Sequence, residues 1–391
     1  MKLIYLANAR IPAEKAHGIQ IMKTCEAFVR EGVEVELVLP FRFNQKFKNI
    51  DPFSYYNLKT KFKITKLFSL DLVPLSRWFS PWGFWLQAFS FAIVSNFYLF
   101  FKRGNLIYSR DEFSLYFLSF WQKNFVYEMH AFPESNFYFY NRIFKKAKKI
   151  IVITHQLKDL LIKQGIESEK TLVAPDGVDL EQFNISESQE SCRQKLNLPQ
   201  DKKIVLYAGH LYKWKGVAVL LEAARKSEIP ALPSGRRDQK PEILFVFVGG
   251  TKEDIESFKL KVISYKLTNV LVVDHRPYSE IPYWLKAADV LILPNSAREK
   301  ISQFYTSPLK LFEYMASGRP IVASNLPSIR EVLSENNAIL VKSDDPISLS
   351  GGIASVLQNS DFSAKIAKQA LQDVEAYSWK KRAKNILSFI K

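Results

Sequence analysis

The chain has 391 residues, of which 55 are Lys or Arg and 39 are Asp or Glu, giving a formal net charge of +16. This length exceeds what a single hydrophobic core supports, so the sequence predicts two domains. A hydrophobic fraction of 47% excludes an intrinsically disordered protein, and a total of only 14 glycines excludes a fibrous one. Two distant cysteines, Cys25 and Cys192, exclude a disulfide framework and favour a cytoplasmic location.

The positive charge is concentrated between residues 41 and 150. This stretch holds 17 Lys or Arg against six Asp or Glu, together with 33 of the 54 aromatic residues. Basic residues interleaved with aromatic ones suit nucleic acid, an anionic membrane surface or a phosphate-bearing acceptor. The alternative is an aromatic core beneath a solvated basic face, and composition alone does not choose between these interpretations.

Short apolar runs alternate with segments of helical period along the whole chain, the pattern of parallel sheets covered by helices. In the first half we expect strands at residues 3–7, 33–39, 106–109, 125–128, 150–154 and 171–174. In the second half we expect them at residues 204–208, 243–248, 270–273, 290–293, 320–323 and 338–341. Each half is predicted to be a Rossmann-like unit with ligands at the carboxyl ends of its strands.

The apolar run at residues 84–101 reaches the lower length limit for a helix that spans a membrane. Gln87, Ser90, Ser95 and Asn96 interrupt this run with polar groups. Polar interruptions favour a helix that is buried or interfacial over one that spans a bilayer. We therefore expect no transmembrane segment.

Three further segments organise the rest of the chain. Residues 181–200 are polar and lack periodicity, so they are the predicted linker between the two halves. Residues 230–241 are rich in Pro and Arg and are predicted to be a surface insertion without a catalytic role. The chain ends in two predicted helices, at residues 361–377 and 380–390.

Two loops that follow predicted strands carry candidate groups for an anion. After the first strand, His17 and Gly18 lead into a helix whose free amides suit an anion, although His17 has an equally good structural interpretation. After the first strand of the second half, Gly209 permits close backbone approach while Lys213 and Lys215 supply positive charge. This loop lacks the Gly-Lys-Ser/Thr run of a Walker motif, which argues against an NTPase.

The densest segment is residues 304–324, which opens a predicted helix near Pro308 and ends at Gly318. Free amides between Ser307 and Lys310 suit phosphate oxygens. One turn further along, Glu313 suits hydrogen bonds from two vicinal hydroxyls, as a carboxylate makes with a ribose. From the residues alone, the alternative that Glu313 is a solvated helix residue is the more common one.

Several segments together resemble glycosyltransferase family 4: Lys215-Gly216, residues 173–179, residues 287–294, Leu311-Phe312-Glu313-Tyr314-Met315-Ala316 and Gly318-Arg319-Pro320. The resemblance runs nearly end to end and is more specific in the second half. It implies an α/β protein of GT-B fold, with two Rossmann-like domains facing each other across a cleft. Residues 1–185, with a crossover helix at 378–391, would bind the acceptor, and residues 186–377 would bind the nucleotide sugar.

The resemblance also implies which residues form the site. Glu313 would bind the donor ribose, His130 would contact the transferred sugar, and Gly18 would lie beside the diphosphate. The expected donor site is completed by Gly209, His210, Lys213, Lys215, Arg276, Pro277, Tyr305, Ser307, Pro308, Leu309 and Lys310, with Arg276 and Pro277 near the base. His130, Lys215 and Glu313 are the expected catalytic residues.

Two positions depart from the family pattern. His210 stands where Arg usually follows the glycine of the phosphate loop, and Tyr305 stands where a Glu usually lies eight positions before Glu313. We therefore expect the neighbouring lysines to neutralise the diphosphate. The sequence has no Asp-x-Asp motif, so no metal or other cofactor is expected, and the substrate would be a UDP- or GDP-sugar.

The resemblance therefore predicts that the protein is a retaining, nucleotide-sugar-dependent hexosyltransferase. It would act on a glycan or lipid-linked acceptor in the synthesis of surface polysaccharide or glycoconjugates. The protein would be cytoplasmic, and the basic, aromatic stretch at residues 41–150 would bind the anionic inner face of the cell membrane. The alternative is a non-catalytic GT-B protein that acts as a membrane-associated partner or scaffold. Nucleic-acid binding ranks last, because the sequence has no helix-turn-helix, zinc or RNA-binding signature.

Overall fold

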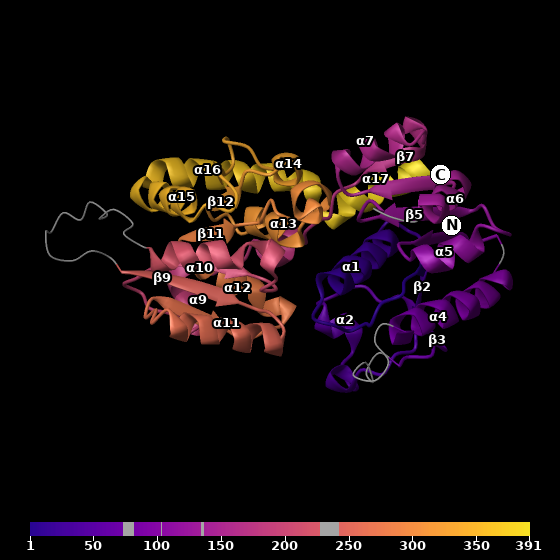
Figure 1. The fold of residues 1–391 in the computed structure, drawn as a ribbon, viewed down its shortest axis with the longest axis horizontal. Helices are drawn as coiled ribbons and strands as arrows, with labels where there is room; N and C mark the ends of the chain where they lie inside the picture. The colour runs from indigo at the N-terminus through magenta and orange to yellow at the C-terminus, as the bar shows by residue number, and fades with distance from the viewer. Residues whose placement is uncertain (73–81, 103, 134–136, 227–241) are drawn as a thin grey trace, which may run out of the picture. The chain divides into compact units, whose positions relative to one another are not determined.

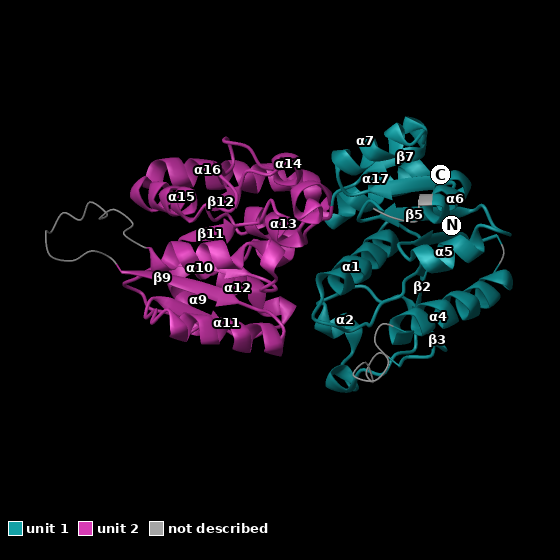
Figure 2. Ribbon diagram, in the orientation of Figure 1, with its two compact units in different colours: residues 1–175, 379–391 teal, residues 176–378 magenta. Residues whose placement is uncertain are grey.

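The computed structural model describes residues 1–72, 82–102, 104–133, 137–226 and 242–391 (Figure 1). The predicted surface insertion at residues 230–241 lies outside these described residues. The chain divides into two compact units (Figure 2). Unit 1 consists of Met1–Pro175 and Trp379–Lys391, and unit 2 consists of Asp176–Ser378.

In the described part of the chain, unit 1 is built on a seven-stranded parallel sheet in the order β3-β2-β1-β4-β5-β6-β7. Its strands are β1 (Lys2–Leu6), β2 (Glu34–Pro40), β3 (Lys63–Leu67), β4 (Leu106–Ser109), β5 (Phe125–Met129), β6 (Lys149–Val152) and β7 (Thr171–Val173). The six predicted strands are confirmed to within two residues. The edge strand β3 was not predicted, because its Lys-Ile-Thr-Lys-Leu sequence resembles a solvated segment.

Helices cover this sheet and supply the other half of its core. They are α1 (Ala16–Arg30), α2 (Pro52–Tyr55), α4 (Trp82–Phe100), α5 (Glu112–Leu118), α6 (Phe137–Lys146), α7 (His155–Lys163) and α17 (Trp379–Ile390), with single turns η1 (Gln45–Phe47) and η3 (Ser168–Lys170). On α1 the residues at helical spacing Ile21, Cys25 and Phe28 are fully buried, as are the central residues of β1. Burying each such side chain contributes about 1.5–3 kcal/mol.

Unit 2 has, within the described residues, a six-stranded parallel sheet in the order β10-β9-β8-β11-β12-β13. The strands are β8 (Lys203–Ala208), β9 (Ile243–Val248), β10 (Val270–Val273), β11 (Val290–Leu293), β12 (Ile321–Ser324) and β13 (Ile339–Val341), each within one residue of its prediction. The helices are α8 (Leu180–Phe183), α9 (Gln189–Lys195), α10 (Val217–Arg225), α11 (Lys252–Ser264), α12 (Ile281–Ala287), α13 (Leu309–Ala316), α14 (Pro327–Arg330), α15 (Pro346–Gln358) and α16 (Ser360–Asp373). Four short turns complete the unit: η4 (Lys213–Lys215), η5 (Tyr278–Glu280), η6 (Ile301–Tyr305) and η7 (Val374–Tyr377).

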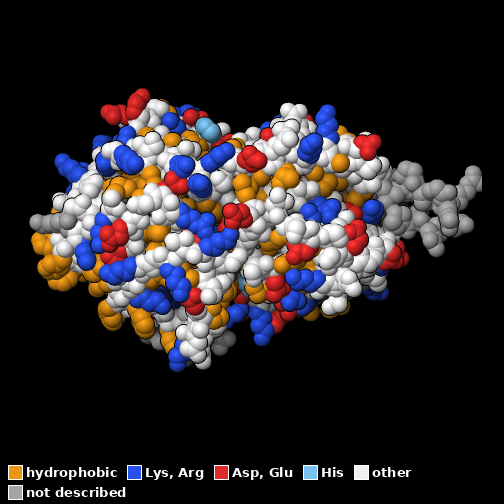
Figure 3. Space-filling model, turned by 180° about the vertical axis from the view of Figure 1, so that it is seen from behind, with side chains coloured by type: hydrophobic (Ala, Val, Ile, Leu, Met, Phe, Trp, Pro, Cys, Tyr) orange, Lys and Arg blue, Asp and Glu red, His pale blue; other side chains and the backbone are white. Residues whose placement is uncertain are grey.

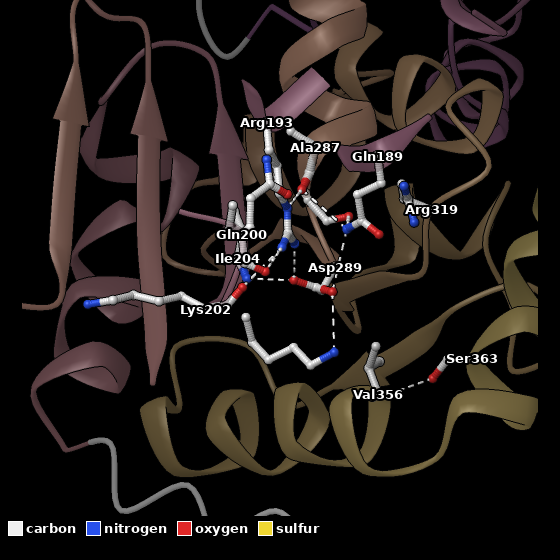
Figure 4. Close-up of polar contacts among 12 residues, drawn as sticks. Gln189, Arg193, Gln200, Lys202, Ile204, Ala287, Asp289, Arg319, Val356 and Ser363 are labelled. Atoms are coloured by element: carbon white, nitrogen blue, oxygen red, sulfur yellow. Dashed lines mark hydrogen bonds and ion pairs between the residues drawn. The ribbon is translucent and has the colours of Figure 1, made fainter. Parts of the chain in front are cut away.

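The linker predicted at residues 181–200 is wrong, because this segment is part of unit 2. Figure 4 shows why: the Arg193 side chain of α9 points at the Asp289 carboxylate, which precedes β11. Arg193 Nη2 donates to Asp289 Oδ2 at 2.6 Å, and the same oxygen accepts from the Ile204 amide of β8 at 2.7 Å. The polar composition of this segment therefore reflects internal pairing rather than solvation.

The units divide between Pro175 and Asp176, ten residues before the predicted boundary. Asp176 belongs to unit 2 because its amide donates to Ser307 Oγ at 3.0 Å. The chain returns to unit 1 at Trp379, one residue after the start of the crossover helix predicted at residues 378–391. There α17, yellow in Figure 1, packs against α1.

Candidate active site

The strand order of unit 2 reverses between β8 and β11, and in open α/β sheets ligands bind at the carboxyl ends of the strands that flank such a point. The loops that follow these two strands lie in close contact. Gly216 adopts φ +72°, and a Cβ atom there would come within 1.7 Å of the Pro294 carbonyl oxygen. Only glycine fits this position, so the Lys215-Gly216 pair is part of the framework of the site.

Lys310, in the first turn of α13, is the central cation of the site. Its side chain is buried, with Nζ 3.7 Å from the centroid of the Tyr207 ring. Among the described residues Nζ has no hydrogen-bond partner. A Cβ atom at Gly209 would lie 2.7 Å from this Nζ, so the ammonium group rests directly against the Gly209 backbone. Burial, with Lys215 nearby, lowers the pKa of Lys310 well below its usual value.

Lys215 supplies a second cation. Its Nζ lies 3.8 Å from the centroid of the Trp214 ring, and burial lowers its pKa to about 8. Lys213, in the same turn, is exposed. Two of the three lysines that we expected to neutralise a diphosphate are thus held in surroundings that penalise a positive charge without a counter-ion.

Glu313 lies one turn beyond Lys310 on α13, and its side chain is only 7% exposed. The interpretation of Glu313 as a solvated helix residue is therefore wrong. Tyr278 Oη donates to Glu313 Oε1 at 3.0 Å. Burial raises the pKa of Glu313 to about 7, although the Tyr278 hydrogen bond and Lys310 both favour the carboxylate. A buried carboxyl group whose ionised form is favoured by a hydrogen bond and a nearby cation suits a ligand that donates hydrogen bonds.

The two residues that depart from the family pattern lie in unit 2. The His210 ring is stacked on Tyr212, with centroids 4.9 Å apart and planes 2° apart, and Tyr207 Oη donates to the His210 carbonyl oxygen at 2.6 Å. Tyr305 is the last residue of η6, next to Phe304, whose ring centroid is 6.2 Å away. Neither residue supplies a permanent positive or negative charge.

The remaining donor-site candidates of unit 2 fall into two groups. Arg276 and Pro277 are exposed and come directly before Tyr278. Ser307 and Pro308 lead into α13, with Pro308 as its N-cap, which confirms the predicted helix start, and Leu309 as its first residue. Lys310, the second residue of α13, therefore belongs to the first turn of this helix.

Gly18, in unit 1, is the third residue of α1 and does not precede the helix as predicted. A Cβ atom at this position would lie 2.3 Å from Tyr56 Oη. This hydroxyl accepts from the Ala13 amide at 2.7 Å and donates to the Ala13 carbonyl at 2.9 Å. Gly18 is thus required for the packing of Tyr56, and its place beside a diphosphate stays a prediction.

His130 follows β5 and belongs to a buried polar network. Its Nε2 lies 2.8 Å from Glu128 Oε1, which also accepts from Arg382 Nη2 at 2.8 Å. Gln20 donates to the same oxygen at 2.5 Å and accepts from Arg110 at 2.8 Å.

The network fixes the protonation of His130. Burial alone would raise the pKa of Glu128, but Arg382 and His130 hold it well below its usual range. An ionised carboxylate only accepts hydrogen bonds, so the His130 proton is on Nε2 and Nδ1 is an acceptor. Burial, with Arg110 nearby, lowers the pKa of His130 to about 4 against the effect of Glu128, so the ring is neutral at physiological pH.

Sequence reasoning missed four residues that shape these sites: Tyr207, Tyr278, Glu128 and Arg382. Tyr207, Glu128 and Tyr278 had an available signal, because each lies within two residues of a site candidate. Arg382 had none, since 254 residues separate it from Glu128. As for metals, no group of three or more His, Cys, Asp or Glu able to hold an ion occurs within the described ranges. Metal independence stays a prediction.

Two parallel α/β units, each with a reversal of strand order, define the GT-B class of fold. The family model "Glycosyltransferase Family 4" matches residues 18–182, and the model "Glycosyl transferases group 1" matches residues 188–373. The chain therefore belongs to glycosyltransferase family 4.

Among curated proteins, a D-inositol 3-phosphate glycosyltransferase of Corynebacterium urealyticum is 27% identical over 275 residues, covering 66% of this chain and 60% of that protein. Among solved structures, sucrose-phosphate synthase from Thermosynechococcus elongatus has a TM-score of 0.75 at 19% identity and covers 99% and 98% of the two chains. Anabaena HepE in complex with UDP-glucose has a TM-score of 0.74 at 18% identity and covers 99% of both. At these identities the structural likeness supports the fold.

Proposed function

We propose that this protein is a retaining hexosyltransferase that transfers a sugar from a nucleotide-diphosphate sugar to a glycan or lipid-linked acceptor. The observation that carries the proposal is the Lys310 ammonium group, which is buried without a hydrogen-bond partner in the described structure and lies against Gly209. Lys215 is a second cation close to Lys310 and disfavours its positive charge, whereas Glu313 favours it. A diphosphate would balance this charge.

The proposed roles follow from this geometry. Lys310, Lys215 and the amides at the start of α13 hold the diphosphate, and Glu313, oriented by Tyr278, accepts hydrogen bonds from the ribose hydroxyls. HepE, which shares the fold, binds UDP-glucose, so a UDP-sugar is the first donor to test and a GDP-sugar the second.

For the reaction we propose attack on the face from which the leaving group departs. The acceptor hydroxyl oxygen forms a bond to the anomeric carbon as the bond from this carbon to the diphosphate oxygen breaks. A phosphate oxygen of the leaving group takes the proton. Lys215 and Lys310 stabilise the negative charge that develops on the diphosphate, which is electrostatic catalysis without a metal. Neutral His130 contacts the transferred sugar through Nδ1.

The acceptor and location are proposed from the distribution of charge. The excess of Lys and Arg falls in residues 41–150, which belong to unit 1, the unit assigned to the acceptor. We propose that unit 1 meets the anionic inner face of the cell membrane, where an acceptor for surface polysaccharide or glycoconjugate synthesis would be displayed.

The test is a panel of UDP-, GDP- and ADP-sugars, scored by protection against heat and by slow donor hydrolysis, followed by mass spectrometry of products formed on lipid-linked acceptors. Lys310→Met should weaken binding of the preferred donor at least tenfold. Lys261→Met, which changes an exposed lysine in the last turn of α11, is the matched control and should change it less than threefold. Equal effects of both variants would contradict the buried diphosphate site.

The second candidate is a non-catalytic GT-B protein that acts as a membrane-associated partner or scaffold. His210 and Tyr305 favour it, because each replaces a charged residue that is usual in the family with one that carries no permanent charge. This candidate predicts that no nucleotide sugar in the panel protects the protein against heat. Donor hydrolysis by the wild type that is lost in Lys215→Ala would exclude it.

A further inference from the structure

The helix α4 (Trp82–Phe100) differs from every other helix in the described part of the chain. It is the one helix there that is long and apolar enough to cross a membrane by length and composition, with a mean hydropathy of 1.3. Its 19 residues include no Asp, Glu, Lys or Arg. Only 39% of its most apolar window is buried, so most of an uncharged helix lies on the protein surface.

The exposed residues of α4 form a continuous apolar stripe. Trp82, Trp85, Leu86, Phe89, Ile93, Phe97 and Phe100 follow one another at helical spacing, and all are exposed. Phe101 extends the stripe beyond the helix and is 70% exposed. At 1.5 Å per residue the stripe is about 28 Å long. A contiguous apolar surface of this size marks an interaction site.

The opposite side of α4 is fixed to unit 1 by polar contacts. Gln87 Nε2 donates to Asn8 Oδ1 at 2.9 Å, and Asn96 Nδ2 donates to the Ser114 carbonyl at 3.0 Å. Tyr98 Oη donates to Glu36 Oε1 at 2.7 Å. A helix that crossed a bilayer would lose these hydrogen bonds and carry the polar groups into hydrocarbon. The contacts therefore hold α4 on the protein, with its stripe facing outward.

Neighbouring segments widen the stripe into a surface. The Leu70 amide donates to Ser90 Oγ of α4 at 3.0 Å, which places the exposed Phe68 and Leu70 beside the helix. On the other flank Trp121 Nε1 donates to Asn96 Oδ1 at 3.2 Å, and Trp121 and Phe120 are exposed as well. We call α4 with these neighbours the aromatic face.

Cations border the aromatic face. Lys66 and Lys123 are exposed and directly adjoin the segments that widen it, while Lys102 follows α4 and lies 5.6 Å from the Tyr98 ring. The Arg142 guanidinium lies 3.6 Å from the centroid of the Phe120 ring. Figure 3 shows hydrophobic side chains gathered along one edge of unit 1 with Lys and Arg side chains among them. An apolar surface bordered by cations is complementary to an anionic bilayer, whose headgroups are negative and whose interior is apolar.

We propose that α4 lies in the plane of an anionic bilayer, with the Trp82-to-Phe101 stripe inserted among the acyl chains and its opposite side kept on unit 1. This deepens the proposed function by naming the element that contacts the membrane, and it rests on that function only for the identity of the acceptor. The aromatic rings enter to roughly 5–10 Å, while the bordering lysines and arginine contact lipid phosphates.

The test is flotation of the full chain with vesicles of phosphatidylglycerol and phosphatidylcholine, compared with phosphatidylcholine alone. Phe97→Glu with Phe101→Glu should lower partitioning onto anionic vesicles at least about tenfold. Leu260→Glu with Ile263→Glu is the matched control, because these exposed apolar residues lie on α11 in unit 2. It should change partitioning less than twofold. Equal losses in the two variants would overturn the proposal.

Depth is measured with a single label, since Cys25 and Cys192 are both buried. Ile93→Cys, near the middle of α4, carrying an environment-sensitive fluorophore should shift to the blue on anionic vesicles and be quenched by bromines near the headgroup end of the acyl chains. Quenching strongest at the bilayer centre would indicate a spanning helix and contradict in-plane insertion. A lipid-independent blue shift that tracks protein concentration would instead show a second copy on the aromatic face. Nucleotide binding measured without lipid tests the proposed function separately.

Discussion

At the scale of single residues, burial in the site of unit 2 shifts the pKa of each of its ionisable groups in the direction that favours the neutral form. Burial lowers the pKa of Lys215 to about 8, lowers the pKa of Lys310 well below its usual value, and raises the pKa of Glu313 to about 7. An arriving diphosphate favours the charged forms of both lysines, because opposite charges at short range stabilise each other. Its binding should therefore be coupled to protonation.

This coupling gives a first prediction. At pH 8 about half of the Lys215 side chains lack a proton, so binding of UDP should take up at least about half a proton per molecule. Calorimetry in two buffers with different ionisation enthalpies measures this uptake. It should shrink at pH 6.5, where Lys215 is already protonated, and in Lys215→Met. If proton uptake is the same in the wild type and in Lys215→Met, then Lys215 does not become protonated when the diphosphate binds.

The network around His130 gives a second prediction at this scale. Glu128→Gln removes the anion that pairs with Arg382 and leaves a buried guanidinium without its carboxylate, which should cost about 3–5 kcal/mol of stability. Glu128→Gln combined with Arg382→Met leaves no such charge. The double variant should therefore be more stable than the sum of the two single changes implies.

The nitrogen chemical shifts of the His130 ring report its tautomer, and a loss of packing alone would not change which nitrogen carries the proton. In the wild type they should report a proton on Nε2 between pH 5 and 8, because the Glu128 carboxylate accepts it. In Glu128→Gln the two neutral tautomers should interconvert. A fixed Nε2 proton in this variant would mean that Glu128 does not set the tautomer.

At the scale of elements, the contact between the loops after β8 and β11 depends on Gly216. Gly216→Ala should lower the thermal midpoint and weaken donor binding, because φ is +72° and the new methyl would meet the Pro294 carbonyl within 1.7 Å. Gly351→Ala is the control, since Gly351 lies in α15 with nothing within 4 Å of a Cβ atom. It should leave donor binding unchanged and stabilise the protein by about 0.5–1 kcal/mol. A Gly216→Ala variant as stable as Gly351→Ala would contradict the role assigned to this contact.

The same scale shows what the sequence could predict. Buried strands such as β9 and β11 are uninterrupted apolar runs, so their positions follow from composition. The edge strand β3 and the helix α9 are polar, and only their tertiary partners give them structure. For α9 that partner is Asp289, about 96 residues from Arg193, and no local pattern reveals such a pairing.

The candidate site also has features that the sequence could predict and features that depend on distant parts of the chain. Lys310 and Glu313 could be proposed because they share one helix turn with a recognisable motif. Their burial could not, because it is produced by Tyr207 and Tyr278, which come from other parts of unit 2. A sequence pattern identifies which residues face a ligand, while the electrostatic state of those residues depends on neighbours that are distant in the chain.

At the scale of the whole molecule, the order of the chain and the order of the units differ. The last helix, α17, follows unit 2 in sequence but belongs to unit 1. It buries Trp379, Ile386 and Leu387, and its Arg382 donates to Glu128 at 2.8 Å and to the Pro175 carbonyl at 2.9 Å. Unit 1 therefore completes its core only after all of unit 2 has been passed in the chain.

Ending the chain after Ser378 should consequently damage unit 1 and spare unit 2. Without α17, the apolar surface of α1 is exposed and Glu128 loses its buried cation, so amide hydrogen exchange should accelerate in α1 and β5. Exchange in β8 and β11 should stay within twofold of the full chain, because the contacts of these strands lie within unit 2. Arg382→Met in the full chain is the control that separates loss of the ion pair from loss of the helix. It should accelerate exchange mainly around Glu128 and leave the rest of α1 protected. Equal acceleration in both units of the truncated chain would mean that α17 supports the molecule as a whole and not unit 1 alone.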